Sequence, residues 1–342
     1  MILLLKTGAG AKGKELLEKK LRSFGIVFRT EKLRGREAVV LECYPSDFSR
    51  DSLSGSTCVE KMIDPSEEYF LASLERKPRW RRFGLGAGRT WKIGELLIAA
   101  GPCAVEGEKS LEETAQAVKA AGGRILRGGS FKPRTSPYSF QGLGEEGLKI
   151  HRKAADRHGL LMLTEVLDRL DLKKVYDIAD MMQVGSRNMQ NFPLLRELGK
   201  LEKPVLLKRG FGSTREELLL AAEYILKGGN EKVILCERGV RGFNPAGKHI
   251  LDLASIALLK EMTWLPIIAD PSHAAGESRF VPMLAKAAVI AGAEGLLMEV
   301  HPAPKSALSD GPQAMTVGEF RKLARELKDI VRLSSRKDGA GK

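Results

Sequence analysis

Four side chains with metal-binding chemistry are spread over the sequence: Cys103, His273, Glu299 and Asp310. A thiolate, an imidazole and two carboxylates form a mixed sulfur, nitrogen and oxygen donor set, which suits Mn²⁺, Fe²⁺, Co²⁺ or Zn²⁺. Their spacing does not by itself bring them together, and Cys103 alone would also fit an inert core cysteine. Because Cys103 ends an apolar segment and precedes a polar loop, we favour its role as a ligand.

A second set of residues is cationic and suits the binding of anions. Arginine forks bind phosphate and carboxylate groups in a bidentate manner, and several cations gathered at one site would repel one another without an anion. Their number exceeds what one phosphate requires and fits two phosphates and a carboxylate. The set consists of Arg127, Lys132, Arg134, Arg187, Lys208 and Arg238.

Two of these cations, Lys132 and Arg134, belong to the segment GGSFKPRTSPYSFQGLG at residues 128–144. Its prolines and glycines exclude a helix or an interior strand, so we expect a loop. The prolines stiffen this loop, which reduces the entropy lost when a ligand binds. Thr135 and Ser136 in the same loop add hydroxyl groups next to Arg134.

The elements that must position these residues alternate between strands and helices from residue 93 onward. Eight apolar strand segments separated by amphipathic helices predict a (β/α)₈ TIM barrel over residues 93–333. A doubly wound open sheet is the alternative. The expected strands cover residues 95–103, 124–130, 161–166, 181–187, 204–210, 232–239, 266–273 and 295–302.

In such a barrel the functional side chains lie at the C-terminal ends of the strands. Strands two to eight all end in charged side chains, which is unusual for buried strands that carry no function. Besides the residues above, these ends carry Glu165, Arg209, Glu237, Asp270 and His301.

Residues 1–64 predict a separate small βαββαβ unit of ferredoxin-like type, with a short second helix over residues 46–55. The unit contains no cluster of catalytic side chains. Its segment GAGAKGKE at residues 8–15 nearly matches a phosphate loop but has Glu15 where a hydroxyl is required, so we do not expect a nucleotide site. We expect residues 65–92 to be a basic linker, including the glycine-rich GLGAG, and residues 334–342 to be a disordered tail.

The net charge of +13 raises the question of nucleic-acid binding. The densest basic segment, residues 76–92, has too few interleaved aromatic residues for such a surface, and basic excess also suits small anionic substrates. The sequence has no apolar segment long enough for a membrane span, and its four cysteines lack CxxC spacing. We therefore expect a cytoplasmic protein that binds neither nucleic acid nor membranes.

Several motifs together resemble 3-deoxy-D-arabino-heptulosonate 7-phosphate (DAHP) synthases, in the metal-dependent branch with an N-terminal ferredoxin-like domain. These motifs are AGPCAVEG, LRGGSFKPRTSPYSFQGLG, QVGSRNMQN, LLKRG, LCERG, DPSH, EVHP and LSDG. The resemblance covers the whole chain, more weakly over residues 1–90. It implies condensation of phosphoenolpyruvate with erythrose 4-phosphate, the first step of the shikimate pathway, with one divalent metal ion as cofactor.

The resemblance also implies roles for individual residues. Arg187, Lys208 and Arg238 would hold the phosphate of phosphoenolpyruvate, and Arg127 and Lys132 would lie nearby. The Arg-Thr-Ser part of the loop would face the aldose phosphate. The implied catalytic residues are Cys103, Lys132 and His273, the metal ligands are Cys103, His273, Glu299 and Asp310, and Asp270 is expected to bind substrate.

Three other functions are alternatives. The sister family that makes 3-deoxy-D-manno-octulosonate 8-phosphate from arabinose 5-phosphate shares many motifs but differs at KPRTS. A Schiff-base aldolase would use Lys208 as nucleophile, and an inactive barrel would serve only as a binding module. By resemblance we expect a homo-oligomer, a tetramer, and tyrosine or phenylalanine as candidate effectors of residues 1–64; association with a chorismate mutase is left open.

Overall fold

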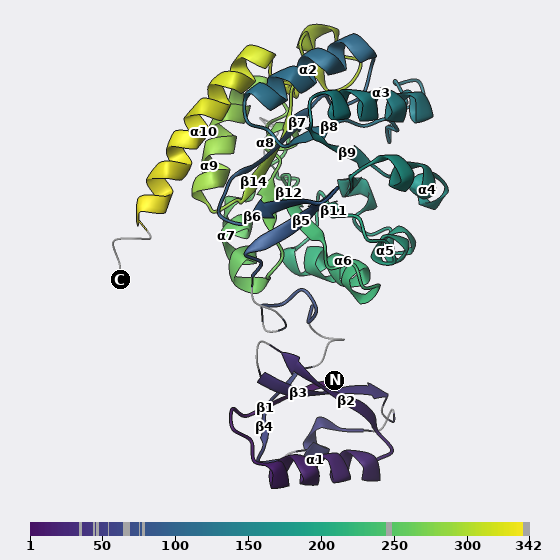
Figure 1. The fold of residues 1–342 in the computed structure, drawn as a ribbon, viewed down its shortest axis with the longest axis vertical. Helices are drawn as coiled ribbons and strands as arrows, with labels where there is room; N and C mark the ends of the chain where they lie inside the picture. Colours follow the sequence, from purple (N-terminus) through teal and green to yellow (C-terminus); the bar gives the residue numbers. More distant parts are fainter. Residues whose placement is uncertain are drawn as a thin grey trace. The chain divides into compact units, whose positions relative to one another are not determined.

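The structure is a computed structural model in which residues 1–33, 36–43, 45, 48–53, 55–63, 69–74, 76, 79–243 and 248–337 are described. The chain forms two compact units, Met1–Arg79 and Trp80–Lys342. Figure 1 shows the small sheet of the first unit and the barrel of the second. The units are described separately below.

The first unit is an antiparallel sheet with the order β2-β3-β1-β4. Its elements are β1 (Ile2–Leu5), α1 (Ala11–Ser23), β2 (Val27–Leu33), β3 (Arg36–Cys43), the short 3₁₀ turn η1 (Arg50–Leu53) and β4 (Val59–Ile63). The helix expected over residues 46–55 is wrong for the described residues, which contain only η1. The segment has no apolar stripe of helical period, and Leu53 is its one fully buried described side chain.

Both faces of this sheet are buried, which explains why β1 is apolar throughout. Leu3 and Leu5 lie in one core cluster with Leu17 and Leu21 of α1. Alternate residues of β1 lie on the opposite face, as the two-residue period of a strand requires. There they pack in a second cluster, formed by Ile2, Leu4, Ala38, Ile63 and Phe70.

The expected linker over residues 65–92 is wrong in its last third, because a β-hairpin begins the second unit. Strand β5 (Arg82–Gly86) pairs with β6 (Arg89–Lys92). Phe83, Leu85 and Trp91 are fully buried and belong to the barrel's own core cluster. That cluster includes the first residues of β7, β8, β9 and β10, so the hairpin closes the amino-terminal end of the barrel. Buried and exposed residues alternate in this hairpin, but the sequence read as a basic linker because basic residues occupy many of the exposed positions.

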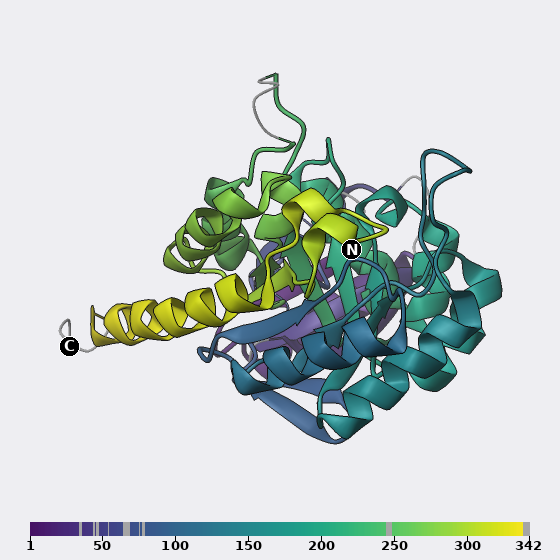
Figure 2. The ribbon, with the colours of Figure 1, turned by 90° about the horizontal axis from the view of Figure 1, so that it is seen from above.

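The second unit is a closed barrel of eight parallel strands, as predicted. Every expected strand segment contains one strand, and helices surround them (Figure 2). The strands are β7 (Leu97–Gly101), β8 (Ile125–Arg127), β9 (Leu161–Glu165), β10 (Met181–Val184), β11 (Val205–Lys208), β12 (Val233–Glu237), β13 (Ile267–Ala269) and β14 (Gly295–Glu299). Strand β14 pairs with β7 and closes the barrel.

The strands connect through helices with recognisable ends. A capping box of Thr214 and Glu217 begins α6, and Asp270 caps α8 by accepting a hydrogen bond from the backbone N–H of His273. The helices are α2 (Glu108–Ala120), α3 (Gly144–Arg157), α4 (Arg169–Ile178), α5 (Phe192–Gly199), α6 (Arg215–Lys227), α7 (Leu253–Met262), α8 (Pro271–Ala275), α9 (Val281–Ile290) and α10 (Val317–Lys337).

Helix α10 extends to Lys337, so the disorder expected from residue 334 is wrong for residues 334–337. The rest of the expected tail, residues 338–342, lies outside the described residues. Within the described part of the chain, we find no helix with the length and apolarity needed to cross a membrane.

Candidate active site and metal centre

The four predicted metal-binding side chains meet at the C-terminal end of the barrel. One ligand atom from each of Cys103, His273, Glu299 and Asp310 lies within 4.8 Å of all the others. Cys103 follows β7, His273 lies on α8 after β13, and Glu299 ends β14. Asp310 lies in the loop after β14 with a left-handed backbone, φ 52°.

The sulfur of Cys103 is surrounded by hydrogen-bonding groups. Its thiol donates to Oδ2 of Asp310 at 3.1 Å, and the sulfur accepts from Nζ of Lys132 at 3.1 Å and from Oγ of Ser309 at 3.0 Å. Burial, and then the negative charge of Glu299, raise the pKa of this thiol to about 12. In the absence of a metal ion Cys103 is therefore a neutral thiol, and a bound cation would replace its proton.

The imidazole of His273 is oriented by a carboxylate behind it. Its Nδ1 donates to Oδ2 of Asp270 at 2.7 Å, so Nε2 is the available ligand atom, 3.4 Å from Oε1 of Glu299 and 3.9 Å from Oδ2 of Asp310. Burial lowers the pKa of His273 despite the two carboxylates. A neutral imidazole held by a carboxylate is a common arrangement around metal ions.

The carboxylate of Glu299 has a donor on each oxygen. Oε1 accepts from Nη1 of Arg127 at 3.0 Å, and Oε2 accepts from Nε2 of Gln313 at 2.6 Å. Burial opposes its ionisation, but the positive charge around it, including that of the bonded Arg127, outweighs this effect and lowers the pKa of Glu299. The Glu299 carboxylate is therefore a buried anion, which suits it to coordinate a cation.

Asp310 completes the donor set as a second carboxylate. Burial opposes its ionisation, but Lys248 and His273 lower the pKa of Asp310 to about 2. The four residues thus offer one sulfur, one neutral nitrogen and two carboxylates. This donor chemistry fits one divalent ion of the transition series.

Five of the six predicted cations fall into three groups. Arg127 and Lys132 are buried at the metal ligands, since Lys132 also donates to the carbonyl oxygen of Cys103 at 3.0 Å. Lys208 is buried in an ion pair with Asp270. Arg187 and Arg238 meet at one aromatic ring, as described below.

The remaining predicted residues lie on the loop that follows β8. Arg134 donates through Nε to the carbonyl oxygen of Phe140 at 3.0 Å, and Thr135 and Ser136 are exposed. None of these three side chains contacts a metal ligand in the described structure. The loop is closed by its own backbone, since the Lys132 N–H donates to Gln141 O at 3.0 Å.

Two strand-end charges bind each other instead of joining the metal ligands. Nη1 of Arg209 donates to Oε2 of Glu237 at 2.8 Å and to Oδ2 of Asp252 at 3.0 Å. The His301 imidazole lies 3.4 Å from Glu106. Glu165 accepts from Gln183 at 3.4 Å near Lys132.

Sequence reasoning missed the residues that support the ligands. Gln313 is buried, donates to Glu299 and accepts from Nζ of Lys248 at 2.7 Å. Ser272 accepts through Oγ from the backbone N–H of Glu299 at 3.0 Å. Both lie within three residues of a predicted site residue, and this adjacency is the signal that could have revealed them.

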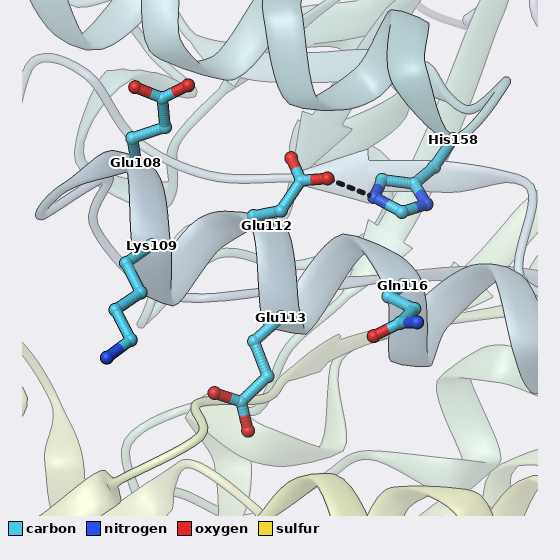
Figure 3. A pocket seen from close by; sticks show the side chains of 6 residues that line it. All are labelled: Glu108, Lys109, Glu112, Glu113, Gln116 and His158. Atoms are coloured by element: carbon cyan, nitrogen blue, oxygen red, sulfur yellow. Dashed lines mark hydrogen bonds and ion pairs between the residues drawn. The ribbon is translucent and has the colours of Figure 1, made fainter.

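A groove of about 570 Å³ lies away from this site, on the exposed side of α2. Figure 3 shows Glu112 paired with His158, with Glu108, Lys109, Glu113 and Gln116 around them. Oε1 of Glu112 lies 2.7 Å from Nε2 of His158. The acidic side chains of the groove are exposed or half-buried, and two of them pair with neighbouring cations, Glu108 with Lys153 and Glu112 with Arg157. We assign it no role in the chemistry.

Comparison with known proteins gives matches that cover the barrel and, for one relative, almost the whole chain. The sequence model of the DAHP synthetase I family matches residues 88–335. A phospho-2-dehydro-3-deoxyheptonate aldolase of Thermotoga maritima is 43% identical over 333 residues, which cover 97% of this chain and 98% of that protein. A 2-dehydro-3-deoxyphosphooctonate aldolase of Acidithiobacillus ferrooxidans is 32% identical but covers 71% of this chain.

Solved structures agree with these matches. The crystal structure of the Thermotoga maritima DAHP synthase is similar with a TM-score of 0.77 and 41% identity, covering 97% of both chains. A truncated form of the synthase from the same organism matches with a TM-score of 0.72 and 43% identity, covering 78% of this chain and 97% of its own.

Proposed function

Because this chain belongs to the DAHP synthetase I family, we propose that its barrel condenses phosphoenolpyruvate with erythrose 4-phosphate at the site described above. The products are 3-deoxy-D-arabino-heptulosonate 7-phosphate and inorganic phosphate. The enzyme is a transferase of the metal-dependent 3-deoxy-7-phosphoheptulonate synthase type. The observation that carries the proposal is the convergence of a four-ligand cluster with the buried cations Arg127 and Lys132.

We assign the metal site to one divalent ion, Mn²⁺, Fe²⁺, Co²⁺ or Zn²⁺, held by Cys103, His273, Glu299 and Asp310. When bound, such an ion supplies Lewis-acid polarisation of the aldehyde oxygen. The protein's own contribution is to keep the ligands oriented. Asp270 and Gln313 hold His273 and Glu299 by hydrogen bonds and thereby fix which of their atoms remain available.

The cations bind and orient phosphoenolpyruvate. Arg187, Lys208 and Arg238 hold its phosphate, and Arg127 and Lys132 lie where its carboxylate and reacting carbons would be placed. Orientation of both substrates supplies the proximity that a bimolecular carbon–carbon bond needs. The C3 carbon attacks the aldehyde, water attacks C2, and phosphate leaves with cleavage of its bond to C2. Lys132 is the best-placed group to move a proton, since its ammonium is buried next to Cys103.

The loop after β8 determines the second substrate. We propose that Arg134, Thr135 and Ser136 bind the phosphate of the four-carbon aldose. Thr135 and Ser136 are exposed, and Arg134 is half-buried with its Nε bound to the carbonyl oxygen of Phe140, which leaves its terminal nitrogens for a ligand that enters the barrel mouth. Full-length coverage by the heptonate relative, against partial coverage by the octonate relative, supports erythrose 4-phosphate over arabinose 5-phosphate.

One assay tests this function. Phosphate release from phosphoenolpyruvate is measured with erythrose 4-phosphate or arabinose 5-phosphate, each with and without a chelator. We expect release with the four-carbon aldose only, and loss of release on chelation. Release with arabinose 5-phosphate alone would assign the sister activity. Trapping of substrate by borohydride would instead support a Schiff base at Lys208, although its ion pair with Asp270 opposes that role.

For the N-terminal unit we propose effector sensing. The unit has no catalytic cluster in its described residues, and small domains of this type pair in homo-oligomers, here a tetramer, with ligands at the new interface. Tyrosine and phenylalanine are the effectors we propose, with coupling of about 1–3 kcal/mol. If millimolar tyrosine or phenylalanine leaves the intact enzyme uninhibited, sensing is ruled out and an assembly role replaces it.

A further inference from the structure

A single aromatic ring gathers three arginines at the barrel mouth. Phe211 follows the end of β11 and lies beneath the guanidinium carbons of Arg238 at 4.8 Å, Arg241 at 5.5 Å and Arg187 at 5.6 Å from its ring centroid. The arginines come from two different strand ends, since Arg187 lies in η2 (Ser186–Asn188) after β10 and the other two follow β12. The ring is therefore the element that these separate loops share.

None of these three arginines has a carboxylate within salt-bridge distance among the described residues. Their neighbour Arg209 shows the contrast, because it pairs with Glu237 and Asp252. The buried Nε of Arg238 also lacks a hydrogen-bond partner within the described part of the chain. Arg238 lies within the electrostatic influence of Asp270, but a cluster of three arginines with no carboxylate in contact among the described residues indicates a site whose anion is supplied by a ligand.

An aromatic ring can hold guanidinium groups without occupying their donors. The negative face of the ring attracts the cation and takes up none of its N–H groups, although Nη1 of Arg238 also donates to the carbonyl oxygen of Gly239 at 3.4 Å. A carboxylate in the same place would use those donors and repel an incoming phosphate. Phe211 can thus hold the arginines in place without competing with a phosphate for their donors, which an ion pair with a carboxylate could not do.

The position of Phe211 is fixed from several sides. Its carbonyl oxygen accepts from the backbone N–H of Arg241 at 2.7 Å, which ties the third arginine to the ring. His249 stacks on the ring with centroids 5.2 Å apart. Burial, and then Arg238, lower the pKa of His249 to about 4, so this neighbour adds no further positive charge near neutral pH.

We propose that Phe211 is a positioning residue that holds Arg187 and Arg238 for the phosphate of phosphoenolpyruvate, with Arg241 as a third cation of the same subsite. The proposal rests on the proposed function, which assigns Arg187 and Arg238 to that phosphate. It adds a residue without any hydrogen-bonding group to the determinants of substrate affinity. It also adds a cation, Arg241, that the motif comparison did not single out.

The test separates substrate affinity from turnover. We expect Phe211→Leu to raise KM for phosphoenolpyruvate about tenfold, with much smaller changes in kcat and in KM for erythrose 4-phosphate. Inorganic phosphate serves as a direct probe that competes with phosphoenolpyruvate, and its inhibition of the enzyme should weaken to the same degree. Phe211→Tyr keeps the ring and should restore both values, and Arg241→Gln should weaken phosphate inhibition as well.

A matched control removes an aromatic ring elsewhere. Phe280 also lies under an arginine, Arg279 at 4.5 Å, but that arginine is paired with Glu277. Phe280→Leu should leave both KM values unchanged. Circular dichroism and thermal unfolding show whether Phe211→Leu folds, and if it does not, Phe211→Met replaces it as the closer match in volume.

The outcomes distinguish the two levels of the proposal. If Arg187→Ala and Arg238→Ala leave KM for phosphoenolpyruvate unchanged, the phosphate assignment itself is wrong. If those variants weaken binding while folded Phe211→Leu and Phe211→Met behave as wild type, the assignment holds and the positioning role is wrong. Equal losses for both substrates in Phe211→Leu would indicate a merely structural role and would also overturn the proposal.

Discussion

The ammonium group of Lys132 lies 3.1 Å from the sulfur of Cys103 and 3.0 Å from the carbonyl oxygen of the same residue. The contact joins the proline-rich loop after β8 to the metal-binding cluster. A group that can give or take a proton is therefore held directly against a metal ligand. Both side chains are buried, so their interaction is not weakened by solvent.

Lys132 should be essential for turnover. We expect Lys132→Met to lower kcat by about 10²–10⁴-fold, because it removes the proposed proton-transfer group while keeping an apolar stem of similar length. Lys132→Arg keeps the charge but not the compact ammonium, and should recover only part of the activity. Steady-state assays with both substrates measure this. Near-normal kcat in Lys132→Met would assign the proton transfer elsewhere.

Cys103 should be required for metal binding but not for folding. Cys103→Ala removes one of four ligands, and we expect loss of bound metal after gel filtration together with loss of activity. Cys58→Ala is the matched control, since Cys58 is a buried cysteine of the first unit whose thiol donates to Gly13 O. Metal content and circular dichroism are measured for both variants. Full activity after exhaustive chelation would contradict the metal requirement.

Metal affinity should rise with pH. Because the pKa of Cys103 is raised to about 12, its thiol is protonated without metal and must lose that proton on binding. His273 has a lowered pKa and is already neutral, and Glu299 and Asp310 are already ionised. Near neutral pH we expect release of about one proton per ion and an affinity that rises about tenfold per pH unit.

Calorimetric titration in buffers of different ionisation enthalpy measures this proton release. The Cys103→Ala variant supplies the control, because any metal that it still binds should release no proton. If the intact protein releases no proton when it binds the ion, the thiolate of Cys103 is already present before binding.

The binding of the two substrates should depend on different arginines. We expect Arg134→Ala to raise KM for erythrose 4-phosphate about tenfold or more with little change for phosphoenolpyruvate, since a charge-assisted contact is lost at one substrate only. Arg187→Ala should show the reverse pattern. Both residues are accessible enough to be replaced without opening the core. Equal losses for both substrates in Arg134→Ala would refute its assignment.

The β5–β6 hairpin should be part of the catalytic unit. Deletion of residues 1–79 keeps Trp80, which packs edge-to-face on Trp264 and Phe83, and should leave a folded, active barrel. Deletion of residues 1–92 also removes the buried Phe83 and Trp91. Each such ring is worth about 3–5 kcal/mol of stability, so this second truncation should unfold or aggregate. Thermal unfolding of the two truncations compares them directly.

The same pair of truncations bears on the N-terminal unit. If the barrel lacking residues 1–79 stays active and no longer responds to tyrosine or phenylalanine, the sensing role is supported. An equally stable protein lacking residues 1–92 would show that the hairpin is an appendage of the barrel and not part of its core.

The sequence alone determined the eight alternating strands and helices and the chemistry at the strand ends. Buried parallel strands are short apolar segments, and their ends are marked by abrupt charge, so residues such as Glu299 and Asp270 could be assigned to one end of the barrel by local pattern. The hairpin was missed for the opposite reason. Its exposed positions are largely basic, and three buried side chains within residues 83–91 gave too weak a signal against that background.

Only the tertiary structure decided which of these residues meet. Cys103 and Asp310 are 207 positions apart and come into contact because β14 pairs with β7, where Glu299 lies opposite Gly101. The hydrophobic periodicity of a strand specifies its buried faces but not its neighbour, so barrel closure cannot be derived from any local segment. The same holds for Phe211, whose ring is an ordinary apolar residue in the sequence and becomes the centre of three arginines only once β10, β11 and β12 lie side by side.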